Sequence, residues 1–520
     1  MSTARTIVIG LAFLTLLRLV LAAVTELSPD EAYYFLWSEN LAPSYYSKGP
    51  GIAIAMKLSS SLFGDSAFGI RMLSPLLGFA TSILLFRLGR GLFDEQTGAW
   101  AVVLLNLTPI FNAGSVLLTI DPLSIFFWVA ALLTFWRALH RASSLNLYWP
   151  ATGLLIGLGF LCKYTNALQL LSIVLLLVLF RRWRGQLRRP GLYLLLLCFL
   201  LCTIPVLVWN HQHAWITVTH LVERGNLDES SGFNPLEFLE FAGMHLGTYS
   251  PILFVGLVWA LWRALRRYGR DDSETYLLFF SLPIISLYFL LSFKETGEGN
   301  WTAPGFITVG LLLVHYWRHL DIGARLKSNL RSAALTVAAL MSCLVLNTEI
   351  VRQAGIPWPY ERDPSTRMRG WRASAAYLDE VLRSTRESLG EDVFVIANRY
   401  QSASILSFYL DDSTPLLQPG PDFPKIHIPE SQLIQNQYSF WPRYDGLSAI
   451  PAGDDPPRSP FLGRHAIFIT DDSRRGNLPR RVRNAFERAE VTGVVDIVRF
   501  NHLVRRLKVF TCYDYRGLPL

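Results

Sequence analysis

The chain has 520 residues, of which 51% are hydrophobic and 17% are charged, and its formal net charge is +8. Residues 1–347 carry 25 Lys and Arg against 19 Asp and Glu, whereas residues 348–520 carry 23 against 21. This composition indicates a protein that lies largely in lipid, and the near-neutral C-terminal part argues against a basic surface that binds nucleic acid.

Eleven apolar segments approach the roughly 20 residues that a membrane-spanning helix needs. They cover residues 6–24, 69–86, 99–115, 120–136, 149–162, 164–180, 191–209, 247–262, 275–293, 302–317 and 332–346. The first could instead be a cleaved signal peptide, since Val20-Leu21-Ala22 resembles a cleavage site. Its apolar run is long for a signal, so we expect an uncleaved helix. The sequence therefore predicts a polytopic α-helical membrane protein.

Charges in the loops predict the topology of these spans. With a cytoplasmic N-terminus, basic clusters such as residues 181–189 lie inside, and the outer loops hold few Lys or Arg. Two long loops, residues 25–68 and 210–246, then face outward together with everything after the last span. We expect a transmembrane domain over residues 1–347 and an extracytoplasmic domain over residues 348–520.

The C-terminal part has the pattern of a small α/β domain. Helices are expected at residues 373–389, 400–410 and 479–489, and strands at residues 393–397, 466–470, 491–500 and 504–513. Residues 411–430 and 445–460 are rich in Gly, Pro and Asp and are expected to be loops.

Two adjacent acids, Asp30 and Glu31, follow the first predicted span. A carboxylate just outside the membrane suits a general base that deprotonates an acceptor hydroxyl. The same residues fit a helix N-terminus, with Ser28 as the cap, Pro29 at the first position and the acids beside the helix dipole. Local spacing favours the cap by roughly two to one. Both roles can hold together.

A further acid, Asp121, lies between two predicted spans in the sequence Thr-Ile-Asp-Pro. A charge at the membrane is costly unless it is used or paired, although an Asp before Pro can also cap a helix. Arg18 and Lys163 pose a similar choice, because each lies within or between apolar segments. For these two, function and pairing inside the helix bundle are equal alternatives.

The order of the motifs resembles that of the GT-C membrane glycosyltransferases. The matching motifs are Asp30-Glu31-Ala32-Tyr33-Tyr34, Tyr45-Tyr46-Ser47-Lys48-Gly49-Pro50, Phe63-Gly64-Asp65 with Arg71, and Thr119-Ile120-Asp121-Pro122-Leu123. They are most similar to the family 39-like group, which includes lipid A aminoarabinose transferases, lipopolysaccharide-core sugar transferases and protein O-mannosyltransferases. Further similar features are Asn300-Trp301-Thr302-Ala303-Pro304 and, in the C-terminal part, residues 398–401 and 436–442.

The resemblance implies that the membrane domain is catalytic. It would transfer a sugar, with inversion, from a polyprenyl-phosphate donor to a glycolipid such as lipid A or lipopolysaccharide core, or to a protein. The reaction would take place at the outer face of the bacterial inner membrane, among membrane lipids and without nucleic acid. Ala32 and Ser47 depart from the aminoarabinose group, so the sugar and the acceptor stay open.

The resemblance also implies roles for individual residues. Asp30 matches the family's acid, Glu31 is the alternate, and Asp121 is a second acidic site residue. Lys48 is the first candidate to hold the donor phosphate, which a cation would stabilise as it leaves. The full set of expected donor- and substrate-binding residues is Lys48, Arg71, Tyr34, Tyr46, His213, His220, Arg224 and Lys294. Each Lys or Arg of this set could instead be an interfacial anchor whose charged end snorkels to the membrane surface.

Neither a metal site nor a nucleotide-binding loop is expected. His211, His213, His220 and His245 lack the His-Glu-x-x-His spacing of zinc enzymes, and no glycine-rich phosphate-binding loop follows a predicted strand. The resemblance implies a reaction with no obligatory cofactor and with a divalent cation as an option.

The sequence is also compatible with two other classes of protein. A transporter or flippase for a lipid-linked sugar would explain eleven spans and intramembrane charges, but it predicts paired repeats with Gly- or Pro-broken helices, which the two halves do not show. A sensor or scaffold would bind envelope glycans through the outer domain and would neither move nor transfer sugar.

Overall fold

The structure, a computed structural model, describes residues 3–225, 233–429, 431, 433–445, 459–471 and 477–517. The chain divides into two compact units. The first comprises Met1–Val24 and Leu41–Asn347, and the second comprises Thr25–Asn40 and Thr348–Leu520. The sequence also suggested a boundary at residue 347, but it assigned residues 25–40 to the membrane domain, whereas they group with the C-terminal unit. In the predicted outer loop 210–246, residues 226–232 lie outside the described part.

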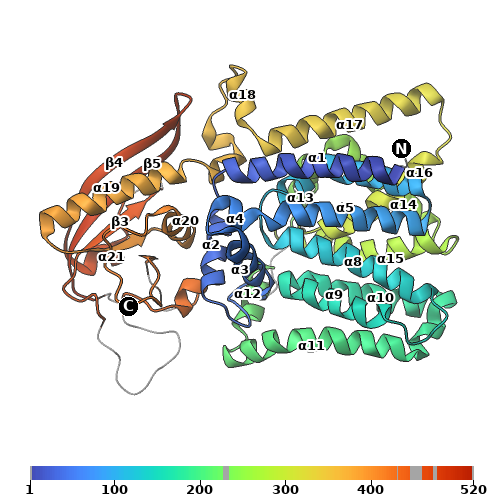
Figure 1. Ribbon diagram of the computed structural model, residues 1–520, viewed down its shortest axis with the longest axis horizontal. Coiled ribbons are helices and arrows are strands. Elements are labelled where there is room, and N and C mark those ends of the chain that lie inside the picture. Colours follow the sequence, from blue (N-terminus) through green and yellow to red (C-terminus); the bar gives the residue numbers. More distant parts are fainter. Residues whose placement is uncertain are drawn as a thin grey trace. The chain divides into compact units, whose positions relative to one another are not determined.

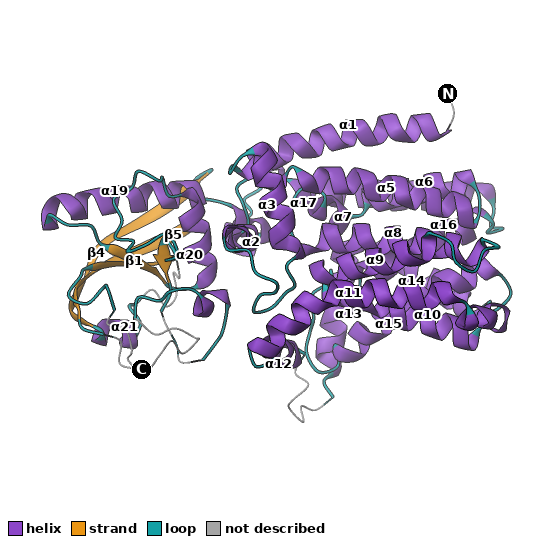
Figure 2. Cartoon of the chain, turned by 60° about the horizontal axis from the view of Figure 1, so that its bottom comes forward, coloured by secondary structure: helices purple, strands orange, loops and turns teal. Residues whose placement is uncertain are grey.

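The described part of the first unit is helical (Figures 1 and 2). Its α-helices are α1 (Thr3–Val24), α3 (Gly51–Phe63), α4 (Ala67–Arg71), α5 (Leu73–Leu92), α6 (Glu95–Leu107), α7 (Pro109–Gly114), α8 (Ile120–His140), α9 (Tyr148–Cys162), α10 (Leu168–Leu179), α11 (Pro190–Gln212), α12 (Ile216–Arg224), α13 (Pro235–Tyr249), α14 (Pro251–Arg266), α15 (Asp272–Leu291), α16 (Ala303–Arg318) and α17 (Ala324–Leu346). Two 3-10 helices, η1 (Tyr164–Ala167) and η2 (Arg181–Arg188), flank α10. The long helices run side by side (Figure 1).

Six helical segments of the described chain are long and apolar enough to cross a membrane, or up to eight if two bent pairs each count as one span. The six are Thr3–Val24, Ala67–Leu92, Ile120–His140, Pro190–Gln212, Asp272–Leu291 and Ala324–Leu346. The bent pairs are Tyr164–Leu179 with Arg181–Arg188 and Pro235–Tyr249 with Pro251–Arg266, and they overlap the predicted spans 164–180 and 247–262. The other three predicted spans, 99–115, 149–162 and 302–317, fall on the shorter helices α6 with α7, α9 and α16. A multi-span helical membrane protein is thus confirmed.

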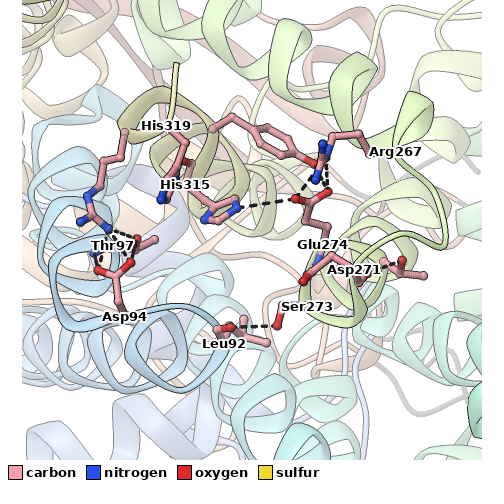
Figure 3. A network of polar contacts seen from close by, with 12 residues as sticks. Leu92, Asp94, Thr97, Arg267, Asp271, Ser273, Glu274, His315 and His319 are labelled. Atoms are coloured by element: carbon pink, nitrogen blue, oxygen red, sulfur yellow. Dashed lines mark hydrogen bonds and ion pairs between the residues drawn. The ribbon is translucent and has the colours of Figure 1, made fainter. Parts of the chain in front are cut away.

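A polar network joins helix ends at one end of the first unit (Figure 3). Glu274, 3% exposed in the first turn of α15, accepts hydrogen bonds from Arg267 at 2.9 Å and from the Tyr316 hydroxyl at 2.9 Å. Arg318 of α16 donates to both carboxylate oxygens of Asp94, the N-cap of α6, at 2.6 Å. These bonds satisfy charges at the ends of α6, α14, α15 and α16, so they fix which helix ends meet.

Arg18 is one of the two intramembrane charges whose role the sequence left open. It is fully buried in α1, and its Nη2 donates to the Asn112 side-chain oxygen at 2.6 Å. Its guanidinium also lies over the Phe111 ring, 5.5 Å from the centroid. Arg18 therefore pairs inside the bundle, where it ties α1 to α7.

The second unit contains a five-stranded sheet with strand order β2-β1-β3-β5-β4. The strands are β1 (Phe394–Ala397), β2 (Ile426–His427), β3 (Ala466–Thr470), β4 (Phe486–Arg499) and β5 (His502–Tyr515). β2, β1 and β3 are parallel, with Val395 opposite Ile426 and Ile467, and β5 pairs antiparallel with both β3 and β4. β1 and β3 are buried along their full length, as their unbroken apolar sequences predict.

The second unit also contains short and long helices. They are α2 (Pro29–Glu39), α18 (Glu349–Gln353), α19 (Trp371–Leu389), α20 (Tyr400–Tyr409) and α21 (Arg480–Asn484), with the 3-10 helices η3 (Tyr360–Arg362), η4 (Pro364–Met368) and η5 (Gln437–Phe440). The backbone of Gly493 in β4 approaches α19 so closely that a Cβ there would lie 2.2 Å from the Tyr377 hydroxyl. α19 therefore covers part of the β4–β5 hairpin (Figure 2).

Two of the expected elements differ in the structure. The helix predicted over residues 479–489 ends at Asn484, because residues from Phe486 onward pair with β5, with Arg488 opposite Tyr513. Strand β2 was expected to be loop, since two residues carry no periodicity; it forms because it pairs with the buried β1.

Candidate active site

Asp121 lies at the centre of a polar cluster in the first unit. It occupies the first turn of α8, and its Oδ1 accepts a hydrogen bond from the Lys163 ammonium at 2.7 Å. Its other oxygen accepts from the Asn300 side-chain amide at 2.6 Å. The side chains of Asp121 and Lys163 are 20% and 9% exposed. A charge pair this sheltered from water holds its geometry more firmly than a surface pair.

Two neighbouring side chains explain how Lys163 reaches Asp121. Asn166 of η1 accepts a hydrogen bond from the Ser124 hydroxyl at 2.6 Å and donates to the Ser124 carbonyl at 3.1 Å. A Cβ on Gly159 of α9 would lie 2.1 Å from the side-chain amide nitrogen of Asn166, so a larger residue there would displace Asn166. The end of α9 is thereby held against the start of α8.

The Lys48 motif is held against the same end of α9. A Cβ on Gly49 would lie 2.4 Å from the carbonyl oxygen of Leu161, and one on Gly51 would lie 2.5 Å from the Cys162 sulfur. The Lys48 carbonyl accepts a hydrogen bond from the Tyr45 amide at 3.0 Å, which closes the turn before it. The glycines therefore let Lys48 enter the neighbourhood of Lys163, because Leu161 and Cys162 directly precede Lys163.

Helix α12 brings His220 and Arg224 to this region. The Thr217 hydroxyl donates to the Tyr45 carbonyl at 3.1 Å, and the ring of His220 packs on that of Tyr46 with centroids 4.5 Å apart. Burial, together with the positive charges of Lys48 and Arg224, lowers the pKa of His220 to about 4. His220 is therefore neutral at physiological pH and lies beside two cations.

Arg224 also contacts the segment that carries Asn300. Its guanidinium lies 3.8 Å from the Glu298 carboxylate and over the Trp301 ring, 5.6 Å from the centroid. Since Asn300 bonds to Asp121, these contacts connect Lys48, His220 and Arg224 with the Asp121 cluster. Local positive potential of this kind favours a phosphate or another anion.

Three expected site residues lie in other surroundings of the first unit. Arg71, the last residue of α4, is fully buried, and its Nη1 lies 3.5 Å from the Ala22 carbonyl oxygen. His213 stacks on Trp209, with ring centroids 4.0 Å apart, and its Nδ1 lies 2.8 Å from the Trp209 carbonyl oxygen. Lys294 follows α15 and is half-buried, without a side-chain hydrogen bond or ion pair to the part of the chain that the structure describes.

The two adjacent acids, Asp30 and Glu31, lie in the second unit and differ in environment. Ser28 caps α2 by accepting from the Glu31 amide at 3.3 Å, and the Glu31 carboxylate accepts from the Ser28 amide at 2.9 Å. Glu31 is fully buried in this capping box, whereas Asp30 is exposed. The helix-cap interpretation is thus confirmed for Ser28 and Glu31. It leaves Asp30 as the acid that solvent reaches.

Aromatic side chains fix α2 within the second unit. The ring of Tyr33 packs on those of Tyr400 and Tyr438, with centroids 4.6 and 6.3 Å apart, and its hydroxyl accepts from the Gln437 amide at 2.7 Å. Tyr34, half-buried, packs on Trp37 at 5.1 Å. The C-terminal motifs around residues 398–401 and 436–442 therefore hold the helix that carries Asp30.

Lys163 and Asn300 were absent from the expected site residues. Lys163 carried a signal, because a charge between two apolar segments indicates function or pairing. Asn300 lay in a recognised motif, but nothing in its local sequence pointed to Asp121, which is 179 residues away.

Two other features of the first unit were candidates for a binding site, a cluster of metal ligands and a narrow apolar cavity in the helix bundle. Within the described ranges, no group of three or more His, Cys, Asp or Glu residues is placed to hold a metal ion. A cavity between α5, α6, α8, α14 and α16 is lined almost wholly by apolar side chains and has a volume of about 30 Å³. It has no room for a sugar.

Comparison with known proteins supports a relationship to membrane glycosyltransferases. Residues 47–209 match the family model described as dolichyl-phosphate-mannose-protein mannosyltransferase. The chain is 31% identical over 293 residues to the lipid A galacturonosyltransferase RgtD of Rhizobium johnstonii, covering 56% of this chain and 60% of that protein. It is 24% identical over 344 residues to the undecaprenyl phosphate-alpha-4-amino-4-deoxy-L-arabinose arabinosyl transferase of Pseudomonas savastanoi, covering 61% and 62%. The chain thus spans about six-tenths of the length of these relatives.

A solved structure shares the fold over the full length. The crystal structure of ArnT from Cupriavidus metallidurans bound to undecaprenyl phosphate has a TM-score of 0.62 and 16% sequence identity, and covers 100% of both chains. The apo structure gives the same TM-score, with 98% of both chains covered. The resemblance seen in the motifs is therefore confirmed, and the chain has the fold of the GT-C membrane glycosyltransferases.

Proposed function

We propose that this chain is a glycosyltransferase that moves a sugar from a polyprenyl-phosphate donor to an envelope acceptor. The observation that carries the proposal is the Asp121–Lys163 pair beside the Lys48 motif. Lys48, Asp121 and Lys163 all lie in the stretch that matches the mannosyltransferase family. The relatives' names support the substrate classes, since one names lipid A and the other names an undecaprenyl-phosphate sugar.

The proposed reaction is a single displacement at the anomeric carbon. The acceptor hydroxyl oxygen attacks that carbon from the face opposite the phosphate, and the bond from the carbon to the phosphate oxygen breaks. Asp30 takes the hydroxyl proton, and polyprenyl phosphate leaves with the bonding electron pair. Asp30 is preferred to Glu31, because Asp30 is exposed whereas Glu31 is fully buried in the helix cap.

In this proposal, cations of the first unit bind and stabilise the donor phosphate. Lys48 and Arg224 compensate the charge that grows on the leaving group, and Asp121 with Asn300 holds Lys163 in position. The neutral ring of His220 can accept a proton as the phosphate binds. Tyr46 shapes the site by packing on His220. The reaction needs no resident metal; a divalent cation stays an optional addition, which EDTA treatment of the purified enzyme would reveal.

We also propose the topology that the charge pattern predicts. Eleven spans, with α6–α7, α9 and α16 as the shorter ones, leave the N-terminus in the cytoplasm and the second unit outside the bacterial inner membrane. The start of α8, the end of α9 and α12 then face outward. A lipid acceptor such as lipid A is preferred to a protein because one relative is named for lipid A.

The test is a transfer assay with the purified full-length chain. Undecaprenyl-phosphate galacturonic acid or aminoarabinose is supplied with lipid A, and the product is detected by mass spectrometry. Asp30→Asn should lower turnover by about 100-fold or more. The matched control, Glu39→Gln, removes an exposed acid near the other end of α2 and should keep wild-type turnover.

Two results would overturn the proposal in different ways. Full turnover by Asp30→Asn would reject the assigned base. Movement of the donor across a vesicle membrane without a new glycosidic bond would identify a transporter.

A further inference from the structure

A basic cavity lies at the C-terminal ends of α5 and α8, away from the candidate active site. Its volume is about 420 Å³, within the range of small-molecule sites. The polar and aromatic residues that line it are Arg87, Arg90, Arg137, His140, Arg141 and Trp136. Asp121 is in the first turn of α8 and His140 ends that helix, so the cavity lies roughly 30 Å along the helix axis from the active site.

The arginines reach the cavity as two pairs. Arg87 and Arg90 are three residues apart on α5, so they project from one side of that helix. Arg137 lies in the last turn of α8 and Arg141 is the C-cap that follows it, and both line the cavity. The guanidiniums of Arg137 and Arg141 also lie over the Tyr148 ring, 5.7 and 5.8 Å from its centroid. The α8 pair is thereby oriented by a shared aromatic surface.

These four positive charges lack carboxylate partners in the described ranges of the chain. Other arginines near these helix ends are paired, as Arg267 is with Glu274 and Arg318 with Asp94. Four like charges around one cavity repel one another, and an anion bound among them would relieve that repulsion. The positive-inside rule accounts for arginines at this end of the bundle, but not for their convergence on one cavity from two helices.

The side chains that line the cavity favour phosphate as the ligand. Guanidinium groups bind phosphate oxygens through paired N–H donors, and two pairs of arginines can hold two phosphates or one phosphate from two sides. Trp136 adds an apolar wall, and Trp is enriched where membrane proteins meet lipid headgroups. Basic pockets between membrane helices are suited to phospholipid headgroups.

We propose that this cavity binds the phosphate of an anionic membrane phospholipid, at a site separate from the transfer reaction. A lipid held here bridges the ends of α5 and α8 and neutralises their arginines. A soluble phosphate or pyrophosphate would use the same guanidinium contacts, so the experiment has one arm for each source.

Native mass spectrometry of the purified full-length chain tests the lipid source. Phosphatidylglycerol is titrated against the wild type, the double variant Arg87→Gln/Arg137→Gln and the control Arg181→Gln/Arg188→Gln. The control removes two exposed arginines of η2, so both variants lose the same charge. We expect lipid affinity to fall about tenfold or more in Arg87→Gln/Arg137→Gln and to stay within about twofold in the control.

The soluble source is tested by melting each protein with inorganic phosphate or pyrophosphate. Stabilisation of the wild type by phosphatidylglycerol, lost in Arg87→Gln/Arg137→Gln alone, supports the lipid site. Stabilisation by pyrophosphate without lipid binding would overturn the lipid assignment. Equal loss of lipid binding in both variants would overturn the site itself, because only total charge would then matter. Melting curves without ligand show whether each variant is folded.

Discussion

The carboxylate of Asp121 and the ammonium group of Lys163 lie 2.7 Å apart, although 42 residues separate them along the chain. Asn300 occupies the second oxygen of the same carboxylate. The pair joins the first turn of α8 to the C-cap residue of α9, and the glycines of the Lys48 motif pack on the last two residues of α9. Lys163, whose role the sequence left open, is thus the partner of Asp121 in this cluster.

Removing one member of this pair should cost more stability than removing both. Asp121→Asn leaves the Lys163 ammonium buried without its counter-charge, which we expect to lower the free energy of unfolding by about 3 kcal/mol. The double variant Asp121→Asn/Lys163→Met should recover most of that loss. Melting of the purified protein in detergent measures both effects.

Turnover separates a structural role of the pair from a functional one. If the pair positions groups for transfer, the double variant stays inactive although it is stable. Wild-type turnover by the stable double variant would show that the pair only holds the helices together.

Because the Lys48 motif packs closely on α9, adding a single methyl group there should lower stability and weaken donor binding. Gly49→Ala places a Cβ against the Leu161 carbonyl, so backbone must move, at a cost of about 1–3 kcal/mol. Because Lys48 is the next residue, we expect KM for the lipid-linked donor to rise with the loss of stability. Gly243→Ala in α13 is the control, since a Cβ there meets no heavy atom within 4 Å. An unchanged KM in Gly49→Ala would argue against a role of Lys48 in donor binding.

His220 predicts a pH dependence of stability. Its pKa is lowered to about 4 in the folded chain, against about 6.5 for an unfolded histidine, so acid protonates the unfolded state first. The stability that depends on neutral His220 is complete above pH 6.5 and is lost as the pH falls towards 4. The melting temperature should therefore fall less over this range in His220→Gln than in the wild type.

The matched control for this pH effect is His319→Gln, which changes an exposed histidine after α16. It should follow the wild type. A donor phosphate placed between Lys48 and Arg224 would offset their charge, so the pKa of His220 should rise when donor binds, which NMR of the labelled ring can follow. An identical acid response in His220→Gln and the wild type would contradict the environment seen around this ring.

The two acids at the start of α2 should respond differently to loss of charge. Glu31→Gln keeps an oxygen for the capping box and should retain stability and turnover, whereas Asp30→Asn should retain stability and lose turnover. Ser28→Ala removes the cap and should cost about 1 kcal/mol in the second unit. Loss of turnover in Glu31→Gln, with the cap intact by limited proteolysis, would reassign the base to Glu31.

Much of the architecture could be predicted because it depends on local signals. Apolar runs of sufficient length located the membrane helices, and unbroken apolar stretches located β1 and β3. Ser28, Pro29 and Glu31 carry the spacing of a capped helix start, which needs no distant partner. The boundary error at Asn484 and the unforeseen β2 arose where pairing with a neighbouring strand outweighs local preference.

Hydropathy and the spacing of short motifs were therefore enough to identify a multi-span membrane protein, its acidic and basic candidates and its family resemblance. Packing decided which candidates meet. Lys163 and Asn300 reach Asp121 only because helices distant in sequence pack together. In the same way, α2 groups with the C-terminal unit because its aromatic side chains pack there, as Tyr33 does on Tyr400 and Tyr438 and Phe35 on Phe408. A hydrogen bond or an ion pair depends on distances that the fold sets, and the periodicity of the sequence does not report those distances.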